Sequence, residues 1–339
     1  MTKTGFITAV HRDRYEMIVE EENIFGRLKS SDFYHTDEVV DFPTVGDYVE
    51  VDYNASGDSR IISVLPRKSV FARLNPTQGL PDQTVAANFD YVFITMSLNQ
   101  DFHITKLERY LTVAWQSGGT PIILLTKSDL CAEKEQYLIQ VSQTATGVET
   151  LCISSKTGEG MERLEPYLAR GKVSVLLGSS GVGKSSMVNS LTGAQQMLTG
   201  DIREADAQGR HTTTYKQCIF LPEEIQLPNG MTIAGGGCII DTPGMRKLIV
   251  SDVEEGMQNS YADIENLAMQ CRFRDCTHKT EPGCAVRKAL EDGVLSQRRW
   301  KTYLDLQREE RFSREREQIM LRKKARTRRK KGDKYALSD

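Results

Sequence analysis

The sequence lacks any long hydrophobic run and carries almost no net charge. None of its stretches approaches the roughly 20 apolar residues that a helix needs to span a bilayer. The N-terminal residues, MTKTGFITAVHRDRYEM, contain no apolar run of signal-peptide length. A net charge of −2 over 339 residues does not by itself indicate a polyanionic partner. We therefore expect a cytoplasmic, monomeric protein without membrane contacts.

Internal repeats and a disulfide framework are also missing. Seven cysteines, an odd number in a chain with no export signal, argue against paired bridges. Four are scattered, mostly in apolar stretches, and are expected to fill core space: Cys131, Cys152, Cys218 and Cys238. The other three, Cys271, Cys276 and Cys284, are clustered and need another explanation. With 39% hydrophobic and 27% charged residues, the chain has the composition of a globular protein that buries a core.

What is present begins with a β-rich segment over residues 1–68. Short runs with partial period-2 alternation, separated by turn residues such as NASGD, predict five strands: GFITAV, RYEMIVE, IFGRLKS, DYVEVDY and SRIISVL. Five short strands in this length suit a small barrel, and an oligonucleotide-binding (OB) fold is one form of it. A small β-domain without a ligand is the alternative.

From Asp90 the pattern changes to strands that alternate with helices. Strands are predicted at YVFITMS, PIILLTKSDL, ETLCISSK and KVSVLLG, and helices at DFHITKLERYLTVAWQSG, AEKEQYLIQVSQTATG, GMERLEPYLARG and from about Lys184 to Leu191. This alternation is typical of a parallel sheet covered on both faces. KQCIFLP and GGCIIDTPG add two strands around a turn at LPNG. We place this α/β domain at residues 69–250 and a helical domain with a basic tail at 251–339.

A phosphate-binding loop follows one of these strands. GSSGVGKSS fits the pattern G-x-x-x-x-G-K-[ST], whose glycines let the backbone close around phosphates with N–H groups pointing inward. The next helix adds the positive end of its dipole. Lys184 is expected to bridge the β- and γ-phosphates, and the Ser185 hydroxyl to ligate Mg²⁺. The predicted phosphate-binding residues are Gly178, Ser179, Ser180, Gly181, Val182, Gly183, Lys184, Ser185, Ser186 and, later in the chain, Gly244.

A second metal-binding and phosphate-binding element is CIIDTPG. Asp241, at the end of a buried strand, is expected to hold Mg²⁺ through water, and the Gly244 N–H to sense the γ-phosphate. RHTTTY lies between the two elements, where a switch loop should supply a threonine to the metal. Thr213 and Thr214 are both possible ligands.

Two further motifs indicate which base is bound. LLTKSDL resembles the guanine-reading element N-K-x-D, in which the Asp129 carboxylate would accept from guanine N1–H and the exocyclic amine. CISSKTG resembles S-A-K, whose backbone N–H meets guanine O6. Each motif follows a predicted strand, so the pair is far more specific than either alone. The predicted guanine-binding residues are Thr126, Lys127, Ser128, Asp129, Ser154, Ser155 and Lys156.

The order of these parts is unusual. GTPases ordinarily run from the phosphate loop through the switch threonine and D-x-x-G to N-K-x-D and S-A-K, whereas this chain begins with TKSD and SSK and ends with DTPG. The termini of a domain often lie close together at its surface, so joining them and reopening the chain elsewhere is tolerated. The sequence therefore predicts a circularly permuted P-loop GTPase domain, with DTPG leading directly into the segment that follows.

The clustered cysteines have metal-ligand spacing. Cys271-x4-Cys276-x-His278-x5-Cys284 offers three thiols and one imidazole, a closed tetrahedral set for one structural Zn²⁺. A small domain with little core gains folding free energy from such a metal. Its surface would suit a phosphate backbone, because basic residues surround the ligands: Arg272, Arg274, Lys279 and Arg287.

Together these features resemble the ribosome small subunit-dependent GTPase A family (RsgA, also called YjeQ). The match runs in order over roughly residues 1–300 and rests on the barrel, the permuted motifs, RHTTT and the cysteine cluster. The resemblance implies an OB-fold, a permuted GTPase domain and a zinc domain. It also implies GTP hydrolysis that is stimulated by the small ribosomal subunit and its rRNA during late subunit maturation.

The chain departs from that pattern in three places. Thr126 replaces the usual Asn, which is expected to weaken one base contact and a brace to the phosphate loop. Met245 follows DTPG where many GTPases have a water-orienting Gln, so His211 is the candidate catalytic residue beside Lys184. The basic tail, LRKKARTRRKK at 321–331, is longer than expected and is either solvated or in contact with rRNA.

Two other functions compete with this interpretation. The chain could be a non-catalytic RNA-binding module whose nucleotide only fixes the orientation of its domains. It could also be an ATP-dependent enzyme, but TKSD and SSK together contradict adenine recognition.

Overall fold

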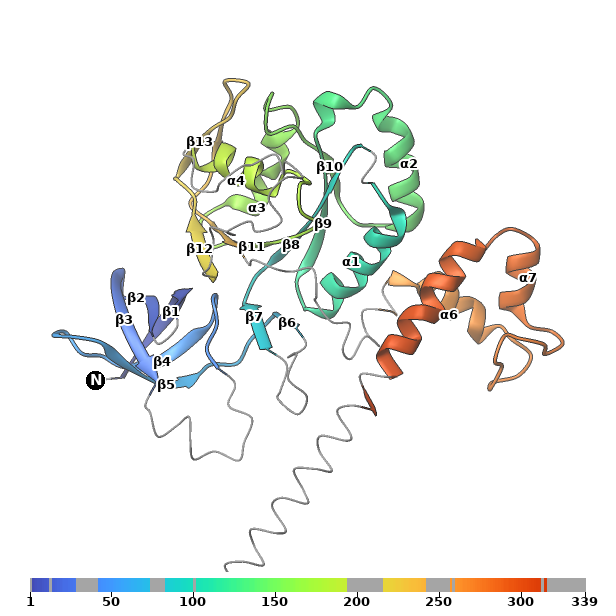
Figure 1. Cartoon of the computed structure of the whole chain (residues 1–339), viewed down its shortest axis with the longest axis horizontal. Coiled ribbons are helices and arrows are strands. Elements are labelled where there is room, and N and C mark those ends of the chain that lie inside the picture. Colours follow the sequence, from blue (N-terminus) through green and yellow to red (C-terminus); the bar gives the residue numbers. More distant parts are fainter. Residues whose placement is uncertain are drawn as a thin grey trace, which may run out of the picture. The chain divides into compact units, whose positions relative to one another are not determined.

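The computed structural model describes residues 2–11, 14–28, 42–73, 83–99, 102–193, 216–241, 257, 260–311 and 314–315 (Figure 1). The chain divides into two compact units, one holding the described residues up to 241 and the other those from 257 onward. The described part contains no helix long and apolar enough to cross a bilayer.

The N-terminal strands close into the predicted barrel. They are β1 (Thr2–Val10), β2 (Tyr15–Val19), β3 (Glu22–Leu28), β4 (Tyr48–Asp52) and β5 (Ser59–Val64). β1 pairs with β2 and β4, β3 pairs with β2 and with β5 in parallel, and β4 pairs with β5, so the ring has no free edge. Alternate apolar side chains fill the interior: Ile7, Tyr15, Met17, Val19, Val49, Val51 and Ile61. The OB-like barrel is therefore confirmed.

A central, mostly parallel part of the same sheet forms the middle of the first unit. Its strands lie in the order β10 (Thr150–Cys152), β9 (Thr120–Thr126), β8 (Tyr91–Ser97), β11 (Val173–Leu177), β15 (Cys238–Asp241) and β12 (Lys216–Phe220). The first five are parallel, and β12 is antiparallel to β15. β11, which precedes the phosphate loop, lies in the middle of the sheet although β8, β9 and β10 come earlier in the chain, as the permutation requires.

Helices and one hairpin cover this sheet. α1 (Ile104–Gln116) contacts β8 and β9, α2 (Lys134–Thr144) contacts β10, and α3 (Glu165–Leu168) contacts β11 (Figure 1). The helix predicted at GMERLEPYLARG is a 3-10 turn, η3 (Met161–Leu164), followed by the single turn of α3. α4 (Lys184–Thr192) follows the phosphate loop as predicted. Where only a turn was expected, β13 (Glu224–Gln226) and β14 (Thr232–Ala234) form an additional hairpin.

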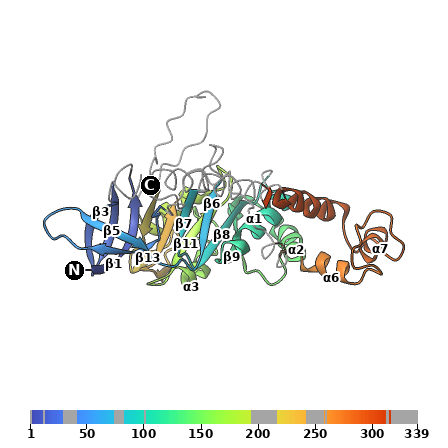
Figure 2. The ribbon, with the colours of Figure 1, turned by 90° about the horizontal axis from the view of Figure 1, so that it is seen from below.

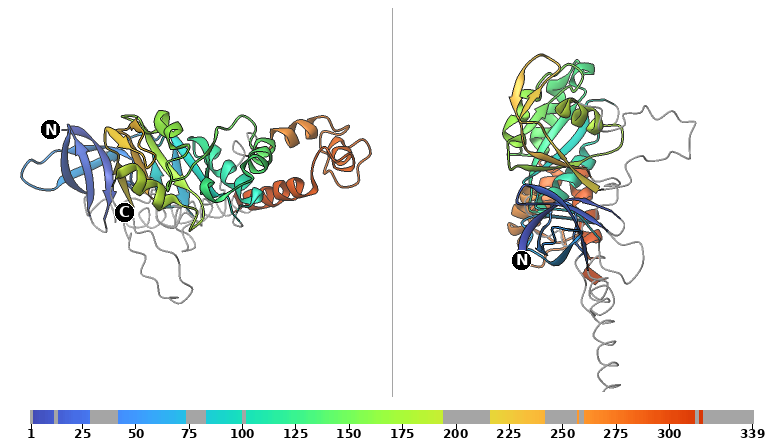
Figure 3. Two further views of the ribbon diagram at one scale, coloured as in Figure 1. Left: turned by 90° about the horizontal axis from the view of Figure 1, so that it is seen from above. Right: turned by 90° about the vertical axis from the view of Figure 1, so that its left-hand side faces the viewer.

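The barrel and the central sheet are joined by hydrogen-bonded strands. Ala9 and Val10 at the end of β1 pair with Gln217 and Lys216 of β12, so the sheet continues into the barrel, as Figures 2 and 3 show. A second hairpin, β6 (Val70–Arg73) with β7 (Gln83–Ala87), follows the barrel. Beside it, Arg67 forms an ion pair with the fully buried Asp47, with Nε and Oδ1 2.6 Å apart. This junction has no signal in the sequence motifs.

The second unit is helical, as predicted. It contains α6 (Ala262–Met269), α7 (Ala285–Glu291) and helical residues 297–311, and the cysteine cluster lies between α6 and α7. All seven cysteines are free thiols. Of the four scattered ones that were expected to fill core space, Cys238 alone is fully buried, and Cys131, Cys152 and Cys218 are partly exposed. For those three, the prediction of a core position is only partly correct.

Candidate nucleotide and metal sites

The phosphate loop lies between β11 and α4 at the carboxyl edge of the sheet. Gly181 and Gly183 have positive φ angles of 80° and 96°, a conformation that side chains with a Cβ rarely adopt. A Cβ on Gly178 would lie 2.4 Å from the Thr95 carbonyl oxygen, so this glycine is required by close packing against β8. The loop therefore has the backbone that its sequence predicts.

The side chains of this loop are partly committed to neighbours. The Lys184 ammonium donates to the Gly178 carbonyl at 2.7 Å and also to the Ser179 carbonyl. Tyr110 of α1 lies 3.3 Å from the Ser179 hydroxyl, counted between their oxygen atoms. Tyr110 carries no motif, and we found no signal for it in the sequence. Its hydroxyl adds a side-chain contact from α1 to the phosphate loop.

Thr126 braces the phosphate loop after all. Its hydroxyl lies 2.5 Å from the Val182 carbonyl oxygen and 3.2 Å from the Met96 carbonyl oxygen, and its side chain is 1% exposed. One hydroxyl proton is shared by two acceptors in this arrangement. Threonine therefore still braces this loop, because its hydroxyl reaches the Val182 carbonyl from the end of β9.

The TKSD and SSK motifs, which are predicted to bind guanine, meet at this edge of the sheet. The Ser154 hydroxyl donates to Asp129 Oδ1 at 2.7 Å, which joins the TKSD and SSK loops. Asp129 itself is exposed, so its second oxygen can accept from a ligand. Lys127 adopts a left-handed backbone, φ 58°, which is uncommon for a residue other than glycine and is often found at functional sites.

Glu159, in the loop that follows SSK, also contacts the TKSD loop. Its carboxylate accepts from the Ser128 hydroxyl at 3.1 Å and from the Lys134 ammonium at 2.6 Å. These bonds, that from Lys134 first, lower the pKa of Glu159. Ser155 is half-buried and Lys156 is exposed. The residues predicted to bind guanine therefore offer the exposed Asp129 carboxylate and the backbone of the 154–156 loop at this edge.

Asp241 lies at the end of β15, next to β11 in the sheet. The pKa of its carboxyl group is raised, because the effect of burial exceeds the opposite effect of the nearby Lys184 ammonium. Carboxylate and hydroxyl oxygens are the ligands that Mg²⁺ prefers. Asp241 and Ser185 could therefore hold one Mg²⁺ together with nucleotide phosphates. Four other predicted site residues, His211, Thr213, Thr214 and Gly244, lie outside the described residues, as does the basic tail at 321–331.

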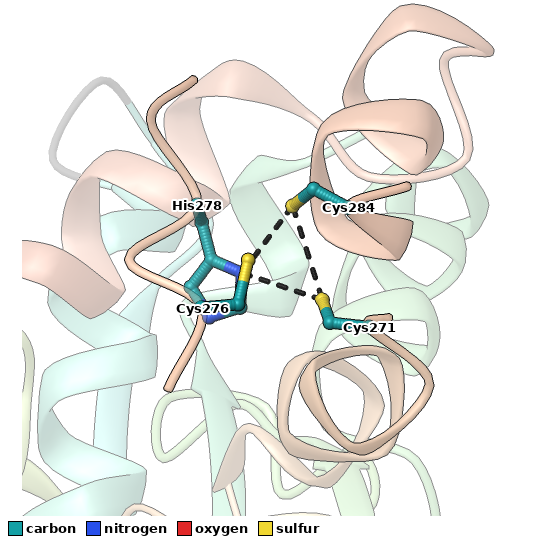
Figure 4. Close-up of side chains that lie close together, drawn as sticks. All are labelled: Cys271, Cys276, His278 and Cys284. Atoms are coloured by element: carbon teal, nitrogen blue, oxygen red, sulfur yellow. Dashed lines mark hydrogen bonds between the residues drawn. The ribbon is translucent and has the colours of Figure 1, made fainter. Parts of the chain in front are cut away.

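The cysteine cluster forms a closed set of metal ligands in the second unit (Figure 4). The ligand atoms of Cys271, Cys276, His278 and Cys284 all lie within 4.8 Å of one another. Cys271 Sγ is 3.8 Å from Cys284 Sγ, and His278 Nδ1 is 3.5 Å and 3.4 Å from these two sulfurs. In tetrahedral zinc sites with Zn–S bonds of about 2.3 Å and Zn–N bonds of about 2.0–2.1 Å, two sulfurs lie about 3.8 Å apart, and a sulfur and a nitrogen about 3.5 Å apart. The geometry fits one metal ion.

The loop around these ligands is held by its own hydrogen bonds. The Glu281 carboxylate accepts from the Thr277 hydroxyl and from the backbone N–H groups of Thr277, Lys279 and Thr280. The bond from the Thr277 hydroxyl first, and then those from the backbone N–H groups of Glu281, Thr277 and Thr280, lower the pKa of Glu281 to about 2. The His278 ring also meets Trp300 edge-on, with centroids 5.7 Å apart. Hydrogen bonds within the 277–281 loop and the contact with Trp300 therefore hold His278 in place.

Comparison with known proteins identifies the family. The profile of the RsgA GTPase family matches residues 64–251. The chain belongs to the RsgA GTPase family. It is 46% identical over 305 residues to "Small ribosomal subunit biogenesis GTPase RsgA 1" of Listeria monocytogenes, covering 90% of this chain and 83% of that protein.

Solved structures of the RsgA type agree with the fold. YjeQ from Thermotoga maritima superposes with a TM-score of 0.64 at 27% identity, covering 90% of this chain and 97% of the other. YloQ, described as a circularly permuted GTPase, superposes with a TM-score of 0.59 at 23% identity, covering 94% and 96%. The predicted combination of OB-like barrel and P-loop GTPase domain, with a metal-ligand cluster in the C-terminal region, is therefore confirmed for this RsgA-family chain.

Proposed function

We propose that this chain binds and hydrolyses GTP in the biogenesis of the small ribosomal subunit, acting late in the maturation of that subunit. The observation that carries the nucleotide assignment is the meeting of three motifs at one edge of the sheet. Ser154 holds Asp129, and Thr126 holds the phosphate loop at Val182, although these residues are far apart in the sequence. The names of its relatives, which are small ribosomal subunit biogenesis GTPases, support the ribosomal role.

Phosphate binding is assigned to residues 178–186. The backbone N–H groups of the loop would meet the phosphate oxygens, and α4 would add its positive end. Lys184 would leave the Gly178 and Ser179 carbonyls to contact the β- and γ-phosphates. Ser185, Asp241 and one of Thr213 and Thr214 would hold Mg²⁺, which neutralises charge on the phosphates when bound.

Guanine recognition is assigned to Asp129 and to the backbone of residues 154–156. The free oxygen of Asp129 would accept from guanine N1–H and the exocyclic amine, and adenine lacks this pair of donors. The hydrophobic stem of Lys127 would lie along the ring. Thr126 keeps the brace to the phosphate loop but has no side-chain amide, so it cannot make the hydrogen bond to the base that Asn would make. We expect guanine selectivity to depend mainly on Asp129.

Catalysis is assigned to Lys184 and to His211. Met245 cannot orient water, so another group must do so, and His211 lies two or three residues from the threonines that would bind the metal. Switch loops often become ordered when the γ-phosphate and a partner are present. We therefore expect slow intrinsic turnover and faster turnover on the ribosomal subunit.

The second unit is assigned to RNA contact, with one structural Zn²⁺ on Cys271, Cys276, His278 and Cys284. The fit of the ligand distances to tetrahedral zinc supports the metal, and the exposed cations beside it support a phosphate-backbone partner. We propose domain boundaries at 1–68, 69–250 and 251–339, and a cytoplasmic monomer. The basic tail at 321–331 is assigned to rRNA contact.

One experiment tests this function against its alternative. GTP hydrolysis is measured under multiple-turnover conditions with and without purified small ribosomal subunits, and with Lys184→Ala as the control. We expect turnover to rise with subunits and to vanish in the control. A nucleotide that stays bound without turnover, whether or not subunits are present, would instead indicate a non-catalytic RNA-binding module, which the family assignment does not favour.

A further inference from the structure

The hairpin β13–β14 ends in a tight turn, and the side chain of Asn229 in this turn reaches the loop that contains Gly158. The turn spans Leu227 to Met231, with Gly230 N–H donating to the Leu227 carbonyl at 2.9 Å and Gly230 at φ 85°. Asn229 is oriented within it, because its Oδ1 accepts from the Met231 N–H at 3.0 Å. Turns of this length and conformation are common in hairpins with glycine at the left-handed position. The amide group Nδ2 of Asn229 remains available for a contact outside the turn.

The hairpin is fixed to the core of the first unit. Ile225, Leu227 and Ile233 are at most 4% exposed and belong to the cluster that also contains Met161 and Met187. β13 contacts α4, which follows the phosphate loop (Figure 1). The base of the hairpin continues the β12–β15 pair, since Leu221 N–H donates to the Gly237 carbonyl at 2.9 Å. The position of the turn is therefore determined by a packed scaffold.

The turn lies against the loop that follows SSK. Asn229 Nδ2 donates to the Gly158 carbonyl at 3.2 Å. The two backbones also touch, since a Cβ on Gly158 would lie 2.6 Å from the Asn229 nitrogen. Gly158 has a φ of 81° and is buried. Both its conformation and this contact require glycine there.

Gly158 is directly connected to the residues assigned to guanine. Its N–H donates to the Ser154 carbonyl at 2.8 Å, which closes the turn that carries Ser155 and Lys156. Ser154 in turn donates to Asp129. A displacement of Gly158 would therefore move the backbone N–H groups that are assigned to guanine O6.

We propose that Asn229 is a positioning residue for guanine: it holds the Gly158 carbonyl and thereby fixes the 154–158 loop at the distance that guanine O6 requires. This inference rests on the proposed function, because it presumes that the loop reads the base. Asn229 does not touch the nucleotide itself. Its contribution would come from pre-organising the loop before binding.

Three variants separate the contact from the turn that carries it. Asn229→Ala removes both the bond to Gly158 and the bond to the Met231 N–H. Asn229→Asp keeps an oxygen for the Met231 N–H but has no donor for Gly158. Thr232→Ala changes an exposed residue on β14 of the same hairpin and serves as the matched control. Thermal unfolding of each variant shows whether the fold is retained.

The readout is the affinity for GDP, IDP and ADP. GDP and IDP carry O6, and ADP carries an amino group at that position. We expect Asn229→Ala and Asn229→Asp to weaken GDP and IDP by the same factor, about threefold to tenfold for one neutral hydrogen bond, and to leave ADP unchanged. Thr232→Ala should match the wild type. Amide hydrogen exchange at Ser155 and Lys156 should become faster in the two Asn229 variants.

Three outcomes would overturn the role of Asn229 and leave the guanine site standing. Wild-type GDP affinity in both Asn229 variants would show that the bond to Gly158 is dispensable. Equal weakening of all three nucleotides would show a general loss of structure. A wild-type result for Asn229→Asp beside a defect in Asn229→Ala would assign the effect to the turn. A wild-type chain that binds GDP and ADP equally would instead refute the guanine site, and the inference with it.

Discussion

Replacing Asp129 by Asn is the sharpest test of the base site. The Asp129 carboxylate has one oxygen on the Ser154 hydroxyl, at 2.7 Å, and one oxygen free for the base. Asn keeps an oxygen that can accept from Ser154, so the two loops should stay joined. The variant therefore changes what the site can recognise without dismantling it, which Asp129→Ala would not guarantee.

The expected loss of affinity follows from the hydrogen bonds that the carboxylate would make to guanine. Hydrogen bonds to charged groups contribute about 1.5–3 kcal/mol each, and the exposure of Asp129 argues for the lower part of that range. Replacing the acceptor of guanine N1–H and the exocyclic amine should cost about 2–4 kcal/mol. At about 1.4 kcal/mol per tenfold change, GDP affinity should fall by about 30- to 700-fold.

The assay compares GDP with xanthosine diphosphate. Xanthine carries a carbonyl where guanine carries its exocyclic amine, and the Asn amide can donate to that carbonyl. The variant should therefore bind xanthosine diphosphate better than the wild type does. Glu135→Gln, an exposed acid on α2, is the control and should leave both affinities unchanged. GDP affinity within twofold of wild type in Asp129→Asn would show that residues 126–129 do not form the base site.

Three further variants test the other assignments. Lys184→Ala should abolish subunit-stimulated hydrolysis and weaken GTP binding, because the charge that compensates the β- and γ-phosphates is removed; near-normal turnover would contradict the phosphate-loop assignment. Cys276→Ser should release zinc and unfold residues 271–284 while GDP binding is retained, and metal analysis that still finds one zinc per chain would reject this ligand. His211→Ala should leave GTP and subunit binding nearly intact but lower stimulated turnover by about 10²-fold or more. Turnover within about threefold of wild type would make His211 a bystander.

Features whose chemistry is local could be predicted from the amino-acid sequence. A phosphate loop needs its glycines, Lys184 and Ser185 at fixed spacing, so the motif alone predicted a backbone that the structure has. The metal-ligand cluster could also be predicted, because its four residues lie within the short segment from Cys271 to Cys284, which brings them together. The alternation of apolar strands and helices predicted the parallel sheet, since burial on both faces leaves a strong pattern.

Contacts between segments that are distant in the chain could not be predicted from the sequence and are seen in the folded protein. The pairing of β1 with β12 joins barrel and sheet across more than two hundred residues, and no periodicity signals which edge strands will meet. The brace from Thr126 to Val182, the contact of Tyr110 with Ser179 and the bond from Asn229 to Gly158 are of the same kind. Thr126 shows the reason most clearly. Motif comparison treats threonine as a departure, but a hydroxyl at the end of β9 reaches the Val182 carbonyl because parallel register brings β9, β8 and β11 to the same edge. Which side chains share that edge depends on strand order, and strand order is a property of the whole fold.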